Sequence, residues 1–342
     1  MTTQPHAPTA NPRSSRPRRA VALAIGILVL AGGGTGIWLW QHNAGNGEAV
    51  ECSALARNAK IEDLLGSASQ APSCDALARA LKRAVKGGTA EDHSVAQAQA
   101  VIDILQATSD VLEESGKKSL DASLHLPMAE MIADYTPETH EILAQLDAEY
   151  VTHISDGKPW RDESGVHIAV DHEVLVRVLR ALSQTPEAYA EVRAAEGHYA
   201  AENLASISPT ADGAALSARP AGNARALGVL DAIAEDVTSA LHEDEAVEWD
   251  KRMVQLLRSK SPAGVPSYAS DAAGYIDTMW TRTLMPTTRN GDKTFREQSS
   301  RILDPWGKGR GDGFKPPSGL KEDCVNGQFG AYEETKRALG DL

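Results

Sequence analysis

The chain has 342 residues and a formal net charge of −13, and 42% of its residues are hydrophobic. These values exclude fibrous and broadly disordered proteins and are typical of a globular chain. Only 5% of the residues are aromatic, and alanine dominates the apolar fraction. Because alanine favours helices and aromatic residues favour strands, this composition predicts an all-α fold rather than a β-sandwich or a barrel.

The charge is distributed unevenly along the chain. Residues 1–19 contain four arginines and no acidic residue, so the remainder carries 30 basic and 47 acidic residues, a balance of −17 (30 − 47). Nucleic-acid binding requires clustered lysine and arginine that contact phosphates. The acidic remainder therefore argues against a nucleic-acid partner.

The segment Ala20–Trp40 is the strongest signal in the sequence. It contains no charged residue, and as a helix it would extend about 31 Å, close to the thickness of the hydrocarbon core of a bilayer. Arginines within residues 16–19 flank its start, and Trp38 and Trp40 lie at its end, where tryptophan favours the membrane interface. The positive-inside rule then places residues 1–19 in the cytoplasm and the rest of the chain outside.

A cleaved signal peptide is the main alternative to this anchor, since residues 31–33 (Ala-Gly-Gly) form a small-residue cleavage site. The apolar run continues beyond that site to Trp40, which favours a retained anchor. We therefore expect a single-pass cell-membrane protein that contacts the lipid bilayer through Ala20–Trp40. The expected parts are a disordered basic cytoplasmic stub (1–19), a transmembrane helix (20–40), a tether (41–48), an extracytoplasmic helical domain (49–303), a Gly/Pro-rich basic loop (304–319) and a C-terminal helical segment (320–342).

From residue 49 onward, apolar residues recur at the spacing of helices. The clearest stripe is Val174, Leu175, Val178, Leu179 and Leu182, and similar stripes predict about eight to ten helices in all. One short strand is expected within Gly165–Val170. Long loops are expected over Ser206–Asn223 and Ser259–Pro266. Residues 49–342 form either one domain or two helical subdomains divided near residues 155–170 or 206–223.

Capping residues indicate where several helices begin and end. Thr89 with Asp92 resembles a capping box, Pro137 suits the first turn of a helix, and Asp171 can cap the helix that follows it. Gly116 and the pair Ser261-Pro262 are typical stop signals.

A set of short segments carries a resemblance to known proteins. In order they are Leu126–Tyr135, Asp171–Ser183, Pro186–Tyr189 and Ala194–Leu204. This order is similar to helical regions of uncharacterised secreted or membrane-anchored proteins of high-GC Gram-positive bacteria, some of them associated with polymorphic toxin systems. The resemblance covers about residues 120–205, implies a helical fold at the cell envelope, and brings no catalytic residue with it.

Three cysteines are too few for a disulfide-built scaffold, and their spacing matches no zinc site. Outside the cytoplasm a disulfide is expected. Cys52 and Cys74 enclose a helix and a loop that could return the chain, so they are the favoured pair. Pairing of Cys324 with either of them is the alternative and would tie the two ends of the domain together.

Signatures of catalysis are missing from the sequence. It contains no HExxH, no Gly-x-Ser-x-Gly and no phosphate-binding glycine loop. His198 with Glu202 on one helix face, and His167 with His172 across a turn, are the nearest approaches to an acid–base or metal pair, and such pairs are common on surfaces. We therefore assign no catalytic residue, metal or cofactor, and we favour a role other than catalysis.

The segment Arg282–Lys321 is locally basic, with nine basic and four acidic residues. It either folds back on the acidic body or contacts an anionic wall polymer, lipid headgroups or an acidic protein. The candidate contact residues are Trp160, Trp306, Lys308, Arg310 and Lys315.

The sequence as a whole predicts a binding or scaffolding module at the cell envelope, whose partner is an envelope protein or an anionic wall polymer. Two alternatives remain. One is an envelope enzyme that acts on wall polymer or peptide, and the other is a membrane-anchored component of a toxin or secretion system.

Overall fold

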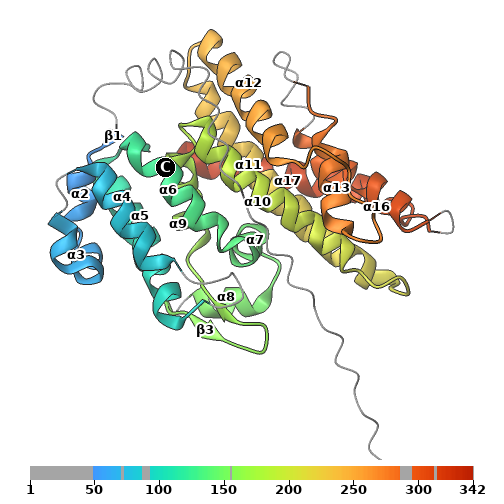
Figure 1. The fold of residues 1–342 in the computed structure, drawn as a ribbon, viewed down its shortest axis with the longest axis horizontal. Coiled ribbons are helices and arrows are strands. Elements are labelled where there is room, and N and C mark those ends of the chain that lie inside the picture. Colours follow the sequence, from blue (N-terminus) through green and yellow to red (C-terminus); the bar gives the residue numbers. More distant parts are fainter. Residues whose placement is uncertain are drawn as a thin grey trace, which may run out of the picture. The chain divides into compact units, whose positions relative to one another are not determined.

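A computed structural model gives the structure of residues 49–70, 73–86, 93–154, 156–285, 295–311 and 314–341. These residues are predominantly helical, as predicted, with two pairs of two-residue strands (Figure 1). In chain order the elements are β1 (Ala49–Val50), α2 (Cys52–Ala56), α3 (Ala59–Leu65), η1 (Gly66–Gln70), α4 (Cys74–Val85), α5 (Val95–Ser115), β2 (Ser119–Leu120), α6 (Ala122–Ala133), α7 (Thr136–Ala144), α8 (Ala148–Ile154), β3 (Trp160–Arg161), β4 (Val166–His167), α9 (His172–Leu182), α10 (Pro186–Ala205), α11 (Gly213–Ser239), α12 (Glu243–Lys260), α13 (Ala272–Thr281), α15 (Gln298–Arg301), α16 (Leu303–Gly309) and α17 (Leu320–Asp341).

The predicted stub, transmembrane helix and tether (1–19, 20–40 and 41–48) lie outside the described residues. None of the helices that the structure describes is both long and apolar enough to cross a bilayer. The membrane anchor at Ala20–Trp40 therefore stays a prediction.

The helices on both sides of residues 155–170 and 206–223 pack against one another. Helix α10 contacts α6, α7 and α11, and helix α11 contacts α7, α9 and α17. Ala44–Leu342 accordingly forms one compact unit. The alternative of two helical subdomains divided at these positions is wrong, because the division points lie between helices that share one core.

Local capping chemistry sets the ends of several helices where the sequence predicts them. The Asp171 carboxylate accepts a hydrogen bond from the Glu173 amide at the start of α9 (2.8 Å), and Pro137 lies in the first turn of α7. Helix α5 ends at Gly116, whose φ of 63° is the left-handed conformation that glycine adopts easily. The capping box before α5 is formed by Ser94 and Gln97, while the predicted Thr89–Asp92 box lies outside the described residues.

The predicted loop over Ser206–Asn223 is largely wrong, because α11 begins at Gly213 and contains Pro220. Tertiary contacts compensate for the proline. The Asn223 side chain donates to the Ala200 backbone oxygen (2.8 Å) and accepts from the Asn203 side chain (3.1 Å), which ties the start of α11 to α10. These bonds are buried, so they outweigh the local preference of proline against a helix interior.

Helices α11 and α17 form the most extensive helix pair of the unit. They approach closely at Gly228, where a Cβ atom would lie 2.2 Å from the Gln328 backbone oxygen. A residue with a side chain does not fit at this crossing. Small residues, Gly228 and the neighbouring Ala331, thus set the distance between these helices.

A strand pair and a disulfide join the first helices of the described chain to the rest of the domain. Strand β1 pairs in parallel with β2, and a disulfide joins Cys52 to Cys74, which confirms the favoured pairing. Cys324 is a buried free thiol on α17, so the alternative pairings with Cys324 are wrong. Burial raises the pKa of the Cys324 thiol to about 12, which keeps it protonated and unreactive at neutral pH.

Candidate functional site

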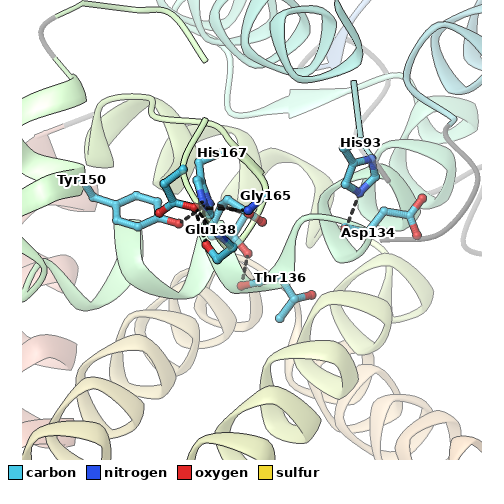
Figure 2. Close-up of polar contacts among 10 residues, drawn as sticks. His93, Asp134, Thr136, Glu138, Tyr150, Gly165 and His167 are labelled. Atoms are coloured by element: carbon cyan, nitrogen blue, oxygen red, sulfur yellow. Dashed lines mark hydrogen bonds and ion pairs between the residues drawn. The ribbon is translucent and has the colours of Figure 1, made fainter. Parts of the chain in front are cut away.

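A polar cluster lies where the β3–β4 hairpin meets helices α7 and α8, and we call its members Glu138, Asp162, Ser164 and His167 the His167 cluster. The hairpin contains the expected short strand, reduced to Val166–His167. The His167 ring contacts the Glu138 carboxylate through Nδ1 at 3.2 Å and the Asp162 carboxylate through Nε2 at 3.0 Å. Figure 2 shows the His167 ring beside Glu138 and Tyr150, with His93 directed at the Asp134 backbone oxygen instead.

The two carboxylates hold the His167 ring in its charged form. The hydrogen bond to Glu138, together with the one to Asp162, raises the pKa of His167 to about 9. Glu138 is buried, with 7% of its surface exposed, and a buried carboxylate is stable when a cation neutralises it. Each charge in the cluster therefore stabilises the other.

The carboxylate of Asp162 also organises the tip of the hairpin. Its Oδ1 atom accepts hydrogen bonds from the Ser164 amide (2.6 Å), the Ser164 hydroxyl (2.7 Å) and the Gly165 amide (3.2 Å). These bonds, first those from the Ser164 side chain and from His167, hold the pKa of Asp162 well below its usual value. An aspartate that bonds backbone amides two and three residues later is typical of a tight turn.

The cluster contains the three groups of a catalytic triad: a serine hydroxyl (Ser164), a histidine (His167) and a carboxylate (Glu138). The Ser164 Oγ atom is 3.0 Å from His167 Nε2. A general base must be neutral to accept the proton of the hydroxyl, whereas His167 is charged below pH 9 and the Ser164 hydroxyl donates to Asp162. The His167 cluster therefore holds the hairpin in place through ion pairs and does not activate Ser164 as a nucleophile.

Aromatic packing connects the hairpin to helix α8. The Trp160 ring stacks on His153 at a centroid distance of 4.4 Å and meets the edge of Tyr150 at 4.9 Å. The Tyr150 hydroxyl lies 3.3 Å from His167 Nδ1. Trp160, a predicted contact residue, is thus half-buried inside the protein, where it positions α8 instead of standing free on the surface.

Helix α8 forms one wall of a groove of about 420 Å³, which we call the α8 groove. Helices α7, α9, α11 and α17 provide its other walls. Its apolar lining consists of Ile142, Leu143, Tyr150, Val151, Ile154, Val229, Ala331 and Ala338. The volume lies within the range of about 300–1,000 Å³ that ligand sites occupy.

Charged residues in the α8 groove are mostly acidic. The carboxylates of Glu141, Asp147, Asp171, Glu173 and Glu334 line it, together with a single guanidinium, that of Arg225. Arg225 pairs with Glu334 at 3.2 Å. Burial lowers the pKa of His172, which also lines the groove, so this histidine adds no positive charge at pH 7. Burial, with the nearby charge of Asp147, raises the pKa of Glu141.

The described part of the basic segment Arg282–Lys321 folds back on the domain. Helix α16 (Leu303–Gly309) takes up the first part of the predicted loop 304–319, and the Trp306 side chain is fully buried at 0% exposure. The Arg310 guanidinium lies 5.2 Å from the Trp306 ring centroid and 4.1 Å from that of Phe314, and it donates to the Ser208 backbone oxygen (2.8 Å).

The prediction that Trp306 is an exposed contact is therefore wrong, because apolar burial outweighs the turn preference of its Gly/Pro-rich surroundings. Arg310 is half-buried, and its guanidinium contacts the Trp306 and Phe314 rings of the same domain. Lys308 and Lys315 are exposed, and Lys308 also lines a cavity of about 490 Å³ beside α16. Helix α17 covers the segment expected to be helical after this loop.

The remaining histidine pairs do not form a metal site. His198 lies 3.6 Å from Glu202 and 3.8 Å from Asp277, as a half-exposed group of ion pairs. Within the described ranges, no group of three or more His, Cys, Asp or Glu residues could hold a metal ion. His172 lies at the start of α9 and His167 in the hairpin, so the two belong to the groove and to the cluster, respectively.

Sequence reasoning named His167 but missed Glu138 and Asp162 as its partners. Glu138 lies 29 residues before His167, and only the packing of the hairpin on α7 brings the two together. The turn around Asp162 did carry a signal, since Asp followed by Ser and Gly is typical of a hairpin tip.

No family model, characterised protein or solved structure matches this chain. The resemblance over residues 120–205 therefore stays a prediction, and a function has to be argued from the geometry of the domain itself.

Raising the pH from 6 to 10 is expected to destabilise the native protein by about 1–2 kcal/mol more than the His167→Gln variant. A histidine whose pKa is raised on folding, here from 6.5 to about 9, stabilises the fold fully below pH 6.5 and loses that contribution as the pH passes through 9. The effect is modest because Asp162 is partly exposed and water screens its charge. Urea denaturation at pH 6, 8 and 10 measures it, and parallel pH profiles for the two proteins would contradict the ionic assignment.

Proposed function

We propose that residues 49–341 form a binding module at the cell envelope that holds a partner protein in the α8 groove. The observation that carries the proposal is an apolar groove bordered by exposed large apolar side chains. Val151 in its wall is 57% exposed, and Leu146, between the lining residues Gln145 and Asp147, is 54% exposed. Covering such side chains with a partner removes apolar surface from water, which lowers the free energy of the complex.

The setting at the cell envelope rests on two further observations. The charge-free segment Ala20–Trp40 has the length of a membrane anchor. The Cys52–Cys74 disulfide supports an oxidising compartment, since disulfides persist outside the cytoplasm and are rare within it. Binding is favoured over catalysis because the serine and histidine that come closest to a catalytic pair are fixed in an ion-paired turn.

Site-specific crosslinking in the cells that make the protein tests this proposal. A photo-crosslinking amino acid at position 151 of the full chain is expected to give one major protein adduct. The same amino acid at position 329 is the matched control, because Phe329 on α17 is equally exposed (56%) and is not among the residues that line the groove.

The adduct at position 151 should also disappear when excess unlabelled full-length chain competes for the partner. Equal adducts from both positions, or none from position 151, would contradict a binding function of this groove.

A further inference from the structure

We infer that the occupant of the α8 groove is a cationic amphipathic helix of a partner protein. This inference rests on the proposed function and specifies the partner by its chemistry. Three features carry it: the apolar lining, the excess of negative charge around that lining, and the helical construction of the walls.

The charge around the groove favours a cation. Five carboxylates and one guanidinium give a nominal charge of −4 (1 − 5). Arg225 neutralises Glu334 and also donates to the Ala144 backbone oxygen (2.6 Å), so it is committed within the domain. Lysine or arginine side chains that flank an apolar face would complement the remaining carboxylates.

Glu141 and Asp147 show why a cation would be stabilised here. The raised pKa of Glu141 reflects its partial burial and the nearby charge of Asp147. The Asp147 carboxylate accepts a hydrogen bond from the Glu149 amide at the start of α8 (2.8 Å). This bond holds the carboxylate in place. A cationic side chain between the two carboxylates would relieve their repulsion.

The walls indicate that the occupant is helical. All groove residues belong to helices or to the short connections beside them, and helix interiors satisfy their own backbone hydrogen bonds. An extended peptide would find no strand edge here to pair with. A helix brings its own backbone bonds, so it can place apolar side chains against Val151 and Ile154 without leaving polar groups unpaired.

Labelled synthetic peptides test the inference on the full chain in nanodiscs of phosphatidylcholine. The photo-crosslinking amino acid at position 151 reports binding at the groove and excludes peptide adsorbed to lipid. The probes are a Lys/Leu peptide with leucines at helical spacing, a scrambled peptide of the same composition, and a Glu/Leu peptide with the helical pattern. Half-maximal crosslinking by the helical Lys/Leu peptide is expected at a concentration at least 10-fold lower than for either control.

A matched pair of charge variants completes the test. Asp147→Asn with Glu173→Gln removes two groove charges while the Asn still caps α8, and the half-maximal concentration is expected to rise about 10-fold. The control pair Glu62→Gln with Asp63→Asn removes two exposed charges from α3, outside the groove. This variant should leave the half-maximal concentration unchanged.

Equal crosslinking of all three peptides, or no response to the groove variant, would overturn the inference. If position 151 still captured a specific cellular partner, the binding function would survive this failure. The loss of that capture as well would overturn both proposals.

Discussion

Replacing Arg193 by Met is expected to lower the free energy of unfolding by about 3–5 kcal/mol, because it leaves a buried carboxylate without its cation. Arg193 on α10 is 0% exposed, and its Nη1 atom lies 2.8 Å from the carboxylate of Asp231, whose side chain is 2% exposed. Burial raises the pKa of Asp231, while Arg193 opposes that rise. Without the guanidinium the carboxylate has to be protonated or buried unpaired.

The surrounding contacts explain why the loss is large. The guanidinium also donates to the Gln298 side chain (2.6 and 3.0 Å) and to the Leu227 backbone oxygen (3.2 Å). The Gln328 side chain donates to the other Asp231 oxygen (2.5 Å). One network thus joins α10, α11, α15 and α17, and every member of such a network depends on the others.

Arg252→Met is the matched control, since Arg252 pairs with Glu187 at the same distance of 2.8 Å but the two side chains are 45% and 34% exposed. We expect a loss of about 0–1 kcal/mol there. Urea denaturation at pH 5 and pH 8 measures the stability of both variants. The loss for Arg193→Met should be greater at pH 8, because the unpaired Asp231 carboxylate has to take up a proton to stay buried and this costs more free energy at higher pH. Adding Asp231→Asn should recover part of the loss at pH 8. Equal losses in the two arginine variants would contradict the role of the network.

Replacing both Cys52 and Cys74 by Ala is expected to lower the free energy of unfolding by about 3 kcal/mol. The disulfide spans 22 residues, and removing it restores conformational freedom to the unfolded chain. Since the bridge ties α2 to α4, we expect α2 and the adjoining strand β1 to exchange their amide hydrogens faster than the rest of the domain. Hydrogen exchange and thermal unfolding measure the two effects.

Thiol labelling supplies the control and tests the compartment. Protein taken from cells without a reductant and denatured should label at one cysteine only, the buried Cys324. A reductant should lower the melting temperature of the native protein and leave that of the double variant unchanged. Three labelled cysteines in the freshly isolated protein would contradict both the bridge and the oxidising compartment.

The sequence by itself predicts the helical class, several helix ends and the disulfide pair. These features depend on neighbours along the chain. The apolar stripe of α9 follows a spacing of three and four residues, Asp171 caps the amides that follow it, and Cys52 and Cys74 are joined by a short segment.

Only the tertiary structure decides which polar residues meet and which apolar residues are covered. Arg193 and Gln298 are 105 residues apart, and Glu138 and His167 are 29 apart. Trp306 is buried although its surroundings predict a loop. The free energy of a charge or a ring depends on the dielectric and the neighbours that packing supplies. The α8 groove arises in the same way, because its walls are five helices from separate parts of the chain.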